Sequence, residues 1–258
     1  MSTSLFHDII FGPIHSRRLG VSLGVNLLPT EGKLCNFDCI YCECGWTKKD
    51  PGSKLRFNRK EDVLRLLEEV LKKRRENGEP LDVITFAGNG EPTMHPDFEE
   101  IIDGTLALRD KYFPEVKVAV LSNATMLGKE SVRSALQKVD RPILKIDSAF
   151  DETIRDINNP LGNYKLEDVI ENMELFKGDL IIQTMFLRGT NNGRAIDNTT
   201  EREVEAWLKV VKRLRPKQVM IYSLDRDTPC ETLIKVNREE LEKIAEKVRA
   251  IGIETSVA

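Results

Sequence analysis

The chain has 258 residues, of which 40% are hydrophobic and 31% are charged, a balance that excludes a disordered or collagen-like protein. Lys and Arg number 39 against 42 Asp and Glu, so the formal charge of -3 gives no overall attraction to nucleic acid or to an anionic membrane. The first twenty residues are too polar for a signal peptide, and no run of about 18 apolar residues occurs anywhere. We therefore expect a cytoplasmic protein with no membrane partner.

From residue 20 onwards, short apolar runs alternate with longer amphipathic stretches, which indicates βαβ units and a parallel sheet. The six predicted strands are 24–28, 82–87, 117–121, 143–147, 180–187 and 218–224. The predicted helices are about 60–77, 97–111, 129–138, 165–175, 200–214 and 238–250. No flexible linker or low-complexity run separates these elements, so we expect a single domain over 1–258. Its core is about 20–225, with an N-terminal lead-in over 1–20 and a C-terminal helical extension over 226–258.

Four of the five cysteines lie within ten residues, whereas Cys230 stands alone. Thiolates crowded into one loop usually share a metal centre, because disulfide frameworks spread their cysteines along the chain. The spacing of Cys35, Cys39 and Cys42 suits three ligands of a 4Fe-4S cluster, which leaves one iron open. The alternative is a structural zinc site with Cys44 as the fourth ligand, on an α/β module without radical chemistry.

A glycine-containing run, FAGNGEPT at residues 86–93, directly follows the second predicted strand. Glycine at the carboxyl end of a strand lets the backbone approach a ligand closely, and Glu91 offers an acceptor for an amino group. Taken alone, this pattern is also typical of a simple turn between a strand and a helix. The glycine run becomes informative in combination with the cysteine loop, which follows the preceding predicted strand.

Together, the cysteine triplet with Tyr41 before its last cysteine and the Asn89-Gly90-Glu91 run resemble the radical SAM (S-adenosyl-L-methionine) superfamily. The resemblance implies a partial (β/α)6 TIM-like barrel of the α/β class. It implies a 4Fe-4S cluster on Cys35, Cys39 and Cys42, and reductive cleavage of SAM to a radical that abstracts a hydrogen atom from a substrate. The run at residues 12–20 and the segment VMIYSLDRDTP resemble small members grouped with tRNA wyosine-type synthases.

The same resemblance implies which residues contact SAM. The cofactor-binding candidates are Tyr41, Gly88, Asn89, Gly90, Glu91, Asp147, Ser148 and Arg188. Among them, Asp147 and Ser148 are the candidates for the ribose hydroxyls, and Arg188 is the candidate for the SAM carboxylate.

An enzyme of this kind implies a reductant such as a flavodoxin or a ferredoxin, and an iron-sulfur oxidoreductase or lyase activity. The substrate stays open among RNA, a glycyl-radical enzyme, a peptide and a small molecule. Residues 188–198 (RGTNNGRAIDN) are polar and glycine-containing, so we predict an irregular loop that is mobile without substrate. With residues 225–229, this loop would close over the barrel and shield the radical from solvent.

Overall fold

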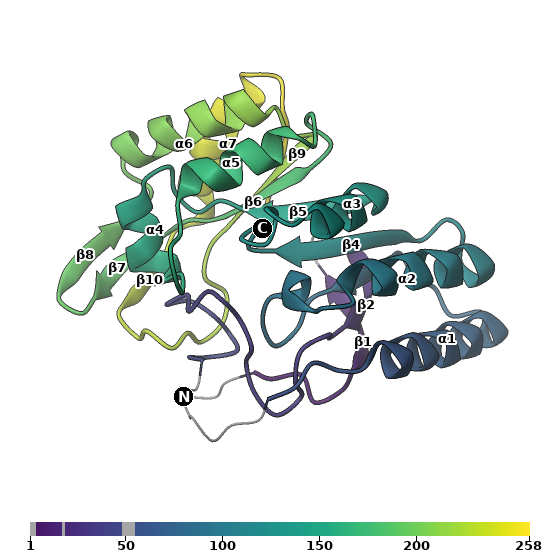
Figure 1. Ribbon diagram of the computed structural model, residues 1–258. Helices are drawn as coiled ribbons and strands as arrows, with labels where there is room; N and C mark the ends of the chain where they lie inside the picture. Colours follow the sequence, from purple (N-terminus) through teal and green to yellow (C-terminus); the bar gives the residue numbers. More distant parts are fainter. Residues whose placement is uncertain (1–3, 17–18, 48–54) are drawn as a thin grey trace.

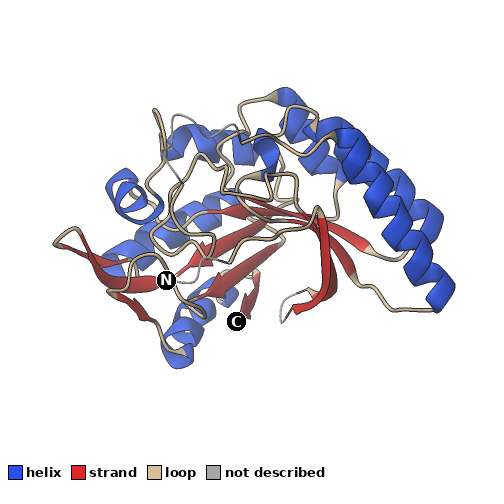
Figure 2. Cartoon of the chain, turned by 90° about the horizontal axis from the view of Figure 1, so that it is seen from below, coloured by secondary structure: helices blue, strands red, loops and turns tan. Residues whose placement is uncertain are grey.

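The computed structural model describes residues 4–16, 19–47 and 55–258. Six parallel strands form the middle of the main sheet. Five lie within two residues of their predicted ends, whereas the first, predicted at 24–28, begins four residues earlier. In sheet order they are β2 (Gly20–Val25), β3 (Val83–Phe86), β4 (Lys117–Ser122), β5 (Arg141–Lys145), β6 (Ile181–Met185) and β9 (Gln218–Tyr222). Figure 2 shows the strands fanning into a curved sheet with the helices around it. The predicted α/β class and partial TIM-like barrel are therefore confirmed.

All six predicted helices are present within two residues of their expected ends. They are α1 (Lys60–Asn77), α2 (Phe98–Tyr112), α3 (Glu130–Lys138), α5 (Leu166–Glu174), α6 (Glu201–Leu214) and α7 (Arg238–Arg249). Figure 1 shows α1, α2 and α3 stacked along one face of the sheet. The sequence did not predict α4 (Asp151–Asn158) or the short 3-10 turn η1 (Pro92–Met94). Among the described helices, none has both the length and the apolar character needed to cross a membrane.

The sheet is buried on both faces, which is why its strands are continuous apolar runs in the sequence. Its outer face joins the helices in one large apolar cluster. Its inner face forms a smaller cluster of alternate strand residues, Val83, Ala119, Ile143, Ile181 and Met220. The inner face is therefore apolar at its middle, and polar groups appear towards the carboxyl ends of the strands.

Both ends of the sheet correct the predicted boundaries. The lead-in contains β1 (Ile10–Ser16), which pairs antiparallel with β2. The predicted helical extension also contains β11 (Glu254–Val257), which pairs in parallel with β9 and makes the sheet eight-stranded. Both strands lie at the edges of the sheet. β1 is largely exposed and β11 is at most half-buried, so neither has the buried apolar pattern by which strands are predicted.

The expectation of an irregular loop over residues 188–198 is wrong. The segment forms a hairpin of β7 (Leu187–Asn191) and β8 (Arg194–Asp197), and β10 (Leu233–Lys235) completes a second, three-stranded sheet. Its turn is Asn192-Gly193, with φ of 50° and 78°. Two consecutive positive φ values define the tight hairpin turn that Asn-Gly favours, because its twist matches that of paired strands. Ile196 is also buried, so the segment does have an apolar residue packed on the core.

Candidate functional site

The cysteine loop docks on the glycine run through its backbone. The amide of Leu34 donates to the carbonyl of Asn89 at 2.8 Å, and the amide of Glu91 donates to the carbonyl of Leu34 at 3.2 Å. Gly90 has a φ of 147°, and a Cβ at this position would lie 1.8 Å from the Leu34 carbonyl oxygen. Only glycine fits there, so this residue allows the contact that places the neighbouring Cys35.

The side chain of Asn89 holds the N-terminal segment. Its Oδ1 accepts from the amide of Phe6 at 2.8 Å, and its Nδ2 donates to the carbonyls of Phe6 and Pro29, each at 2.8 Å. Asn89 is fully buried. Its side chain therefore joins two segments of this chain and is not free to contact SAM.

Glu91 is buried, and both of its carboxylate oxygens are occupied. Oε1 accepts from the Ser122 hydroxyl at 2.8 Å, from the Thr93 amide at 3.1 Å and from the Thr93 hydroxyl. Oε2 accepts from the amide of Asn123 at 2.7 Å. Burial raises the pKa of Glu91, although these hydrogen bonds oppose the shift. The carboxylate thus fixes the turn after β3 against the end of β4.

Side-chain and backbone donors point at two of the three predicted ligand sulfurs. Cys35 Sγ accepts from the Phe37 amide at 3.4 Å and from Asn123 Nδ2 at 3.8 Å. Cys39 Sγ accepts from Asn158 Nδ2 at 3.5 Å. In the protein without a metal, burial raises the pKa of Cys39 to about 11 and raises that of Cys35 still further. Donors aimed at sulfur suit thiolates, so the pocket is arranged for sulfurs that carry negative charge.

A buried lysine supplies a positive charge to the same loop. Lys33 Nζ donates to Asp38 Oδ1 and to the carbonyl of Gly45, each at 3.0 Å. Burial lowers the pKa of Lys33, but the cysteine sulfurs and Asp38 outweigh it and raise the pKa overall. The pKa of Cys42 is lowered to about 6, because Cys44 hydrogen-bonds to its sulfur and Lys33 lies nearby. The loop therefore carries a cation that offsets thiolate charge.

This donor set fits an iron-sulfur cluster. Three thiols on one loop, with amide donors on their sulfurs and a buried cation beside them, match the ligands and hydrogen bonds that such clusters use. Across residues 4–16, 19–47 and 55–258, no three His, Cys, Asp or Glu side chains converge as the ligands of a single metal ion.

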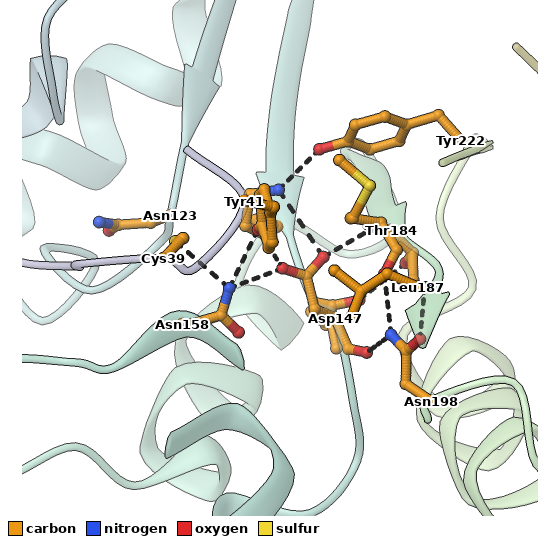
Figure 3. Close-up of polar contacts among 12 residues, drawn as sticks. Cys39, Tyr41, Asn123, Asp147, Asn158, Thr184, Leu187, Asn198 and Tyr222 are labelled. Atoms are coloured by element: carbon orange, nitrogen blue, oxygen red, sulfur yellow. Dashed lines mark hydrogen bonds and ion pairs between the residues drawn. The ribbon is translucent and has the colours of Figure 1, made fainter. Parts of the chain in front are cut away.

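Asp147 lies just beyond the carboxyl end of β5, at the centre of a buried network (Figure 3). Its Oδ2 accepts from the Tyr41 hydroxyl and, at 2.7 Å, from Asn158 Nδ2. Its Oδ1 accepts from the amide of Met185 at 2.9 Å and lies 3.7 Å from Lys145 Nζ. The network connects Tyr41 of the cysteine loop to three other elements, namely β5, β6 and α4.

Lys145, the last residue of β5, is the cation of this network. Its Nζ donates to the Tyr222 hydroxyl at 2.8 Å and lies 5.1 Å from the ring centroid of Tyr41 and 5.4 Å from that of Tyr222. Burial opposes its charge, but Asp147 and Tyr222 raise its pKa. Lys145 therefore stays protonated and acts as a fixed charge beside the cysteine loop.

The other two predicted SAM contacts have partners of their own. Ser148 Oγ donates to Glu203 Oε2 at 2.6 Å, which directs it towards α6. Arg188 donates to Thr199 Oγ1 at 2.7 Å and to Glu240 Oε2 at 2.9 Å. The structure thus brings Tyr41 and Asp147 together, whereas the guanidinium of Arg188 is held between β7 and α7.

Sequence reasoning missed Lys33 and Asn158. Asn158 ends α4, where the Asn158-Asn159 pair is a recognisable helix-ending signal because Asn159 adopts the left-handed conformation. Nothing local marks Lys33 as buried, since lysines are usually exposed. Its position depends on a loop fold that residue types alone do not reveal.

A cavity of about 290 Å³ opens beside this network. Tyr41, Met185 and Tyr222 line it together with Ser223 and Leu224. It lies at the carboxyl ends of β6 and β9, the edge where ligands bind in open and barrel-shaped α/β folds.

A family comparison agrees with this geometry. The model described as "Radical SAM superfamily" matches residues 32–197, which span more than half of the chain and include all three predicted ligand cysteines. The chain belongs to the radical SAM superfamily, whose members bind a 4Fe-4S cluster and SAM. Membership indicates an enzyme.

Within the superfamily, the chain is similar to UPF0026 proteins. It is 32% identical over 237 residues to one from Methanocaldococcus jannaschii, covering 90% of this chain and 68% of that protein. It is also 28% identical to a "GTPase Obg" of Brachyspira hyodysenteriae, covering 91% of this chain but only 32% of that longer protein.

Solved structures share the fold. A radical SAM methyltransferase from Sphaerobacter thermophilus has a TM-score of 0.67 at 15% identity, covering 92% of this chain and 65% of that one. Streptococcus suis SuiB, in a crystal structure bound to S-adenosylmethionine, has a TM-score of 0.63 at 13% identity, covering 88% of this chain and 48% of that one.

Proposed function

We propose that the chain is a single radical SAM domain that holds a 4Fe-4S cluster on Cys35, Cys39 and Cys42. In this proposal it cleaves SAM reductively and abstracts a hydrogen atom from a substrate, as an iron-sulfur oxidoreductase or lyase. The observation that carries it is the docking of Leu34 against Gly90, which sets the cysteine loop at the carboxyl edge of the sheet. The SAM-bound structural relative supports the same choice of co-substrate.

When bound, the cluster supplies the electron that splits SAM into methionine and a 5′-deoxyadenosyl radical. The chain's own contribution is to place and shield the reactants. The two glycines of the run allow close contacts within the chain, since a Cβ at Gly88 would meet the Asn26 side chain and a Cβ at Gly90 would meet Leu34. Tyr41 is fixed by Asp147, which orients its ring beside the cavity.

For the SAM contacts, we retain Tyr41, the glycine run from Gly88 to Glu91, Asp147 and Ser148. Glu91 and Asp147 act in this proposal by shaping the site, because their oxygens are already hydrogen-bonded. Arg188 is not retained, since its ion pair with Glu240 would have to break before it met a carboxylate.

The proposed partners are a cytoplasmic reductant such as a flavodoxin or a ferredoxin, and a substrate still open among RNA, a glycyl-radical enzyme, a peptide and a small molecule. No membrane partner is proposed. Of the predicted lid, only residues 225–229 are retained, because Asp225, Arg226 and Thr228 line the cavity whereas none of its described lining residues belongs to the β7–β8 hairpin.

The test is anaerobic incubation of the reconstituted protein with dithionite and SAM, with chromatographic detection of 5′-deoxyadenosine. The wild-type protein should release it, and a Cys39→Ala variant should not, because one ligand of the cluster is lost. Cys230→Ala is the matched control, because this cysteine lies outside the loop, and it should behave as wild type. A colourless protein with stoichiometric zinc and no 5′-deoxyadenosine would overturn the proposal.

A further inference from the structure

One amide side chain on the inner face of the sheet has no hydrogen-bond partner in the part of the chain that the structure describes. Gln183 of β6 is 6% exposed, and its side chain makes no hydrogen bond with any residue that the structure describes. Its neighbour Thr184 faces the helices, where its hydroxyl accepts from Trp207 Nε1, so strand alternation turns Gln183 to the inside. The amide borders a cavity, so its N–H and C=O groups are free to hydrogen-bond with a molecule that enters from outside.

The amide borders a second cavity, of about 160 Å³. Its walls are mainly apolar, with Leu121, Ile143 and Met220 from neighbouring strands, and none of its described lining residues is charged. Ser22 and Thr85 also line it, but their hydroxyls hydrogen-bond to each other at 2.8 Å. Gln183 is therefore the one described lining side chain that offers both an unpaired donor and an unpaired acceptor.

The N-terminal segment forms an aromatic wall of this cavity. Phe6 and Phe11 stack with ring centroids 3.9 Å apart, and both line the cavity. Phe11 lies so close to the sheet that a Cβ on Gly24 would come within 2.2 Å of its ring. Because Asn89 binds the backbone of Phe6 on both sides, the wall is held in place and not free to collapse into the cavity.

The cavity lies directly beneath the candidate site. Lys145, Met185 and Tyr222 follow Ile143, Gln183 and Met220 by two positions on the same strands, so each pair shares one face of the sheet. Lys145, Met185 and Tyr222 belong to the candidate site, and the residues two positions before them line the cavity. Ile14 borders both this cavity and the larger one.

We propose that this inner cavity binds the reacting part of the substrate, an uncharged group about the size of one ring, through an adjacent donor and acceptor that pair with the Gln183 amide. A cavity of this size holds roughly a benzene molecule, and its described lining residues offer no partner to a charged group. The aromatic wall favours a flat group. The role as a substrate site rests on the proposed function, whereas the binding chemistry rests on the cavity alone.

The test uses three small probes on the anaerobic holoenzyme. 2-Pyridone is a ring with an adjacent N–H and C=O, benzene lacks both groups, and benzoate is charged. Calorimetry or ligand-observed NMR should detect 2-pyridone and benzene but not benzoate. In a Gln183→Leu variant, which keeps the size and removes the amide, the affinity for 2-pyridone should fall about tenfold and that for benzene should stay unchanged.

An Ala87→Val variant keeps the proposal testable if Gln183→Leu fails to fold. Ala87 lines the cavity, so the added carbons should weaken both neutral probes together. If neither neutral probe binds the wild-type protein, or if 2-pyridone binds both forms equally, the inference is wrong and water alone satisfies Gln183.

Failure here is distinguishable from failure of the proposed function. Probe binding requires no turnover, and 5′-deoxyadenosine release requires no probe. A protein that cleaves SAM but binds no probe would overturn the cavity inference alone. A protein that binds 2-pyridone through Gln183 but never cleaves SAM would overturn the proposed function and leave a ligand site.

Discussion

Two buried carboxylates lie near the carboxyl ends of parallel strands, and they differ in the groups that surround them. Glu91 and Asp147 are each 2% exposed, and each has both oxygens occupied. The donors to Glu91 are neutral and come from its own turn and the end of β4. Asp147 also lies beside the Lys145 ammonium, and its donors include Tyr41 from the cysteine loop.

The difference separates two tasks that a buried carboxylate can perform. Glu91 is a local brace, because it links segments that follow one another along the sheet. Asp147 joins regions that are distant in the sequence, since Tyr41 lies 106 positions away from it. Removing the charge of Asp147 should therefore lower the free energy of unfolding more than removing the charge of Glu91.

The largest effect is expected for Asp147→Asn. This change leaves the Lys145 ammonium in a buried site without its carboxylate, which should lower the free energy of unfolding by about 3 kcal/mol. Urea denaturation measures the change. The double variant Asp147→Asn/Lys145→Met removes both charges and should lose less than the single variant. A loss for Asp147→Asn no larger than the loss for Glu91→Gln would contradict the difference between the two carboxylates.

A smaller loss is expected for Glu91→Gln. The amides of Thr93 and Asn123 point at different oxygens of Glu91, so a glutamine NH₂ must face one of these donors. One buried amide would then be unpaired, at a cost of about 2 kcal/mol in the free energy of unfolding. Glu205→Gln, on the exposed side of α6, is the control and should be neutral. Equal stability of the two variants would contradict the role of Glu91 as a brace.

The smallest expected effect is that the stability lost in Glu91→Gln depends on pH. Burial raises the pKa of Glu91 above 4.5 in the folded protein, so its contribution to stability is present below that pH and is lost as the pH rises through the raised pKa. Glutamine does not titrate, so the deficit of Glu91→Gln should be larger near pH 4 than near pH 7. Paired urea titrations of the apoprotein at about these two pH values would measure it, and a deficit that grew with pH would refute the raised pKa.

The fold was largely predictable because its central strands are buried on both faces and its helices are amphipathic. The edge strands β1 and β11 are not fully buried on either face and carry no such signal. The β7–β8 hairpin did carry one, in Asn192-Gly193, but the polar composition of the segment favoured a loop over a paired strand. A turn signal is therefore more informative than polarity where the two disagree.

The sequence motifs of the site could be predicted, but the hydrogen bonds that join them could not. The cysteine spacing and the glycine run each reflect a local requirement, so they can be recognised in the sequence. The partners of Asp147 and of the sulfurs depend on side chains such as Asn158, which lies 119 positions from Cys39. No local pattern encodes a contact of that separation.

The separation of these contacts has a consequence for synthesis. The cysteine loop leaves the ribosome early, but the amides that face Cys35 and Cys39 belong to Asn123 and Asn158, which are translated much later. Closing such long segments is slow and entropically costly. The thiols of a nascent chain are therefore open to oxidants and stray metal ions until α4 has been made, and the finished sulfur pocket can form only after more than half of the protein has been translated.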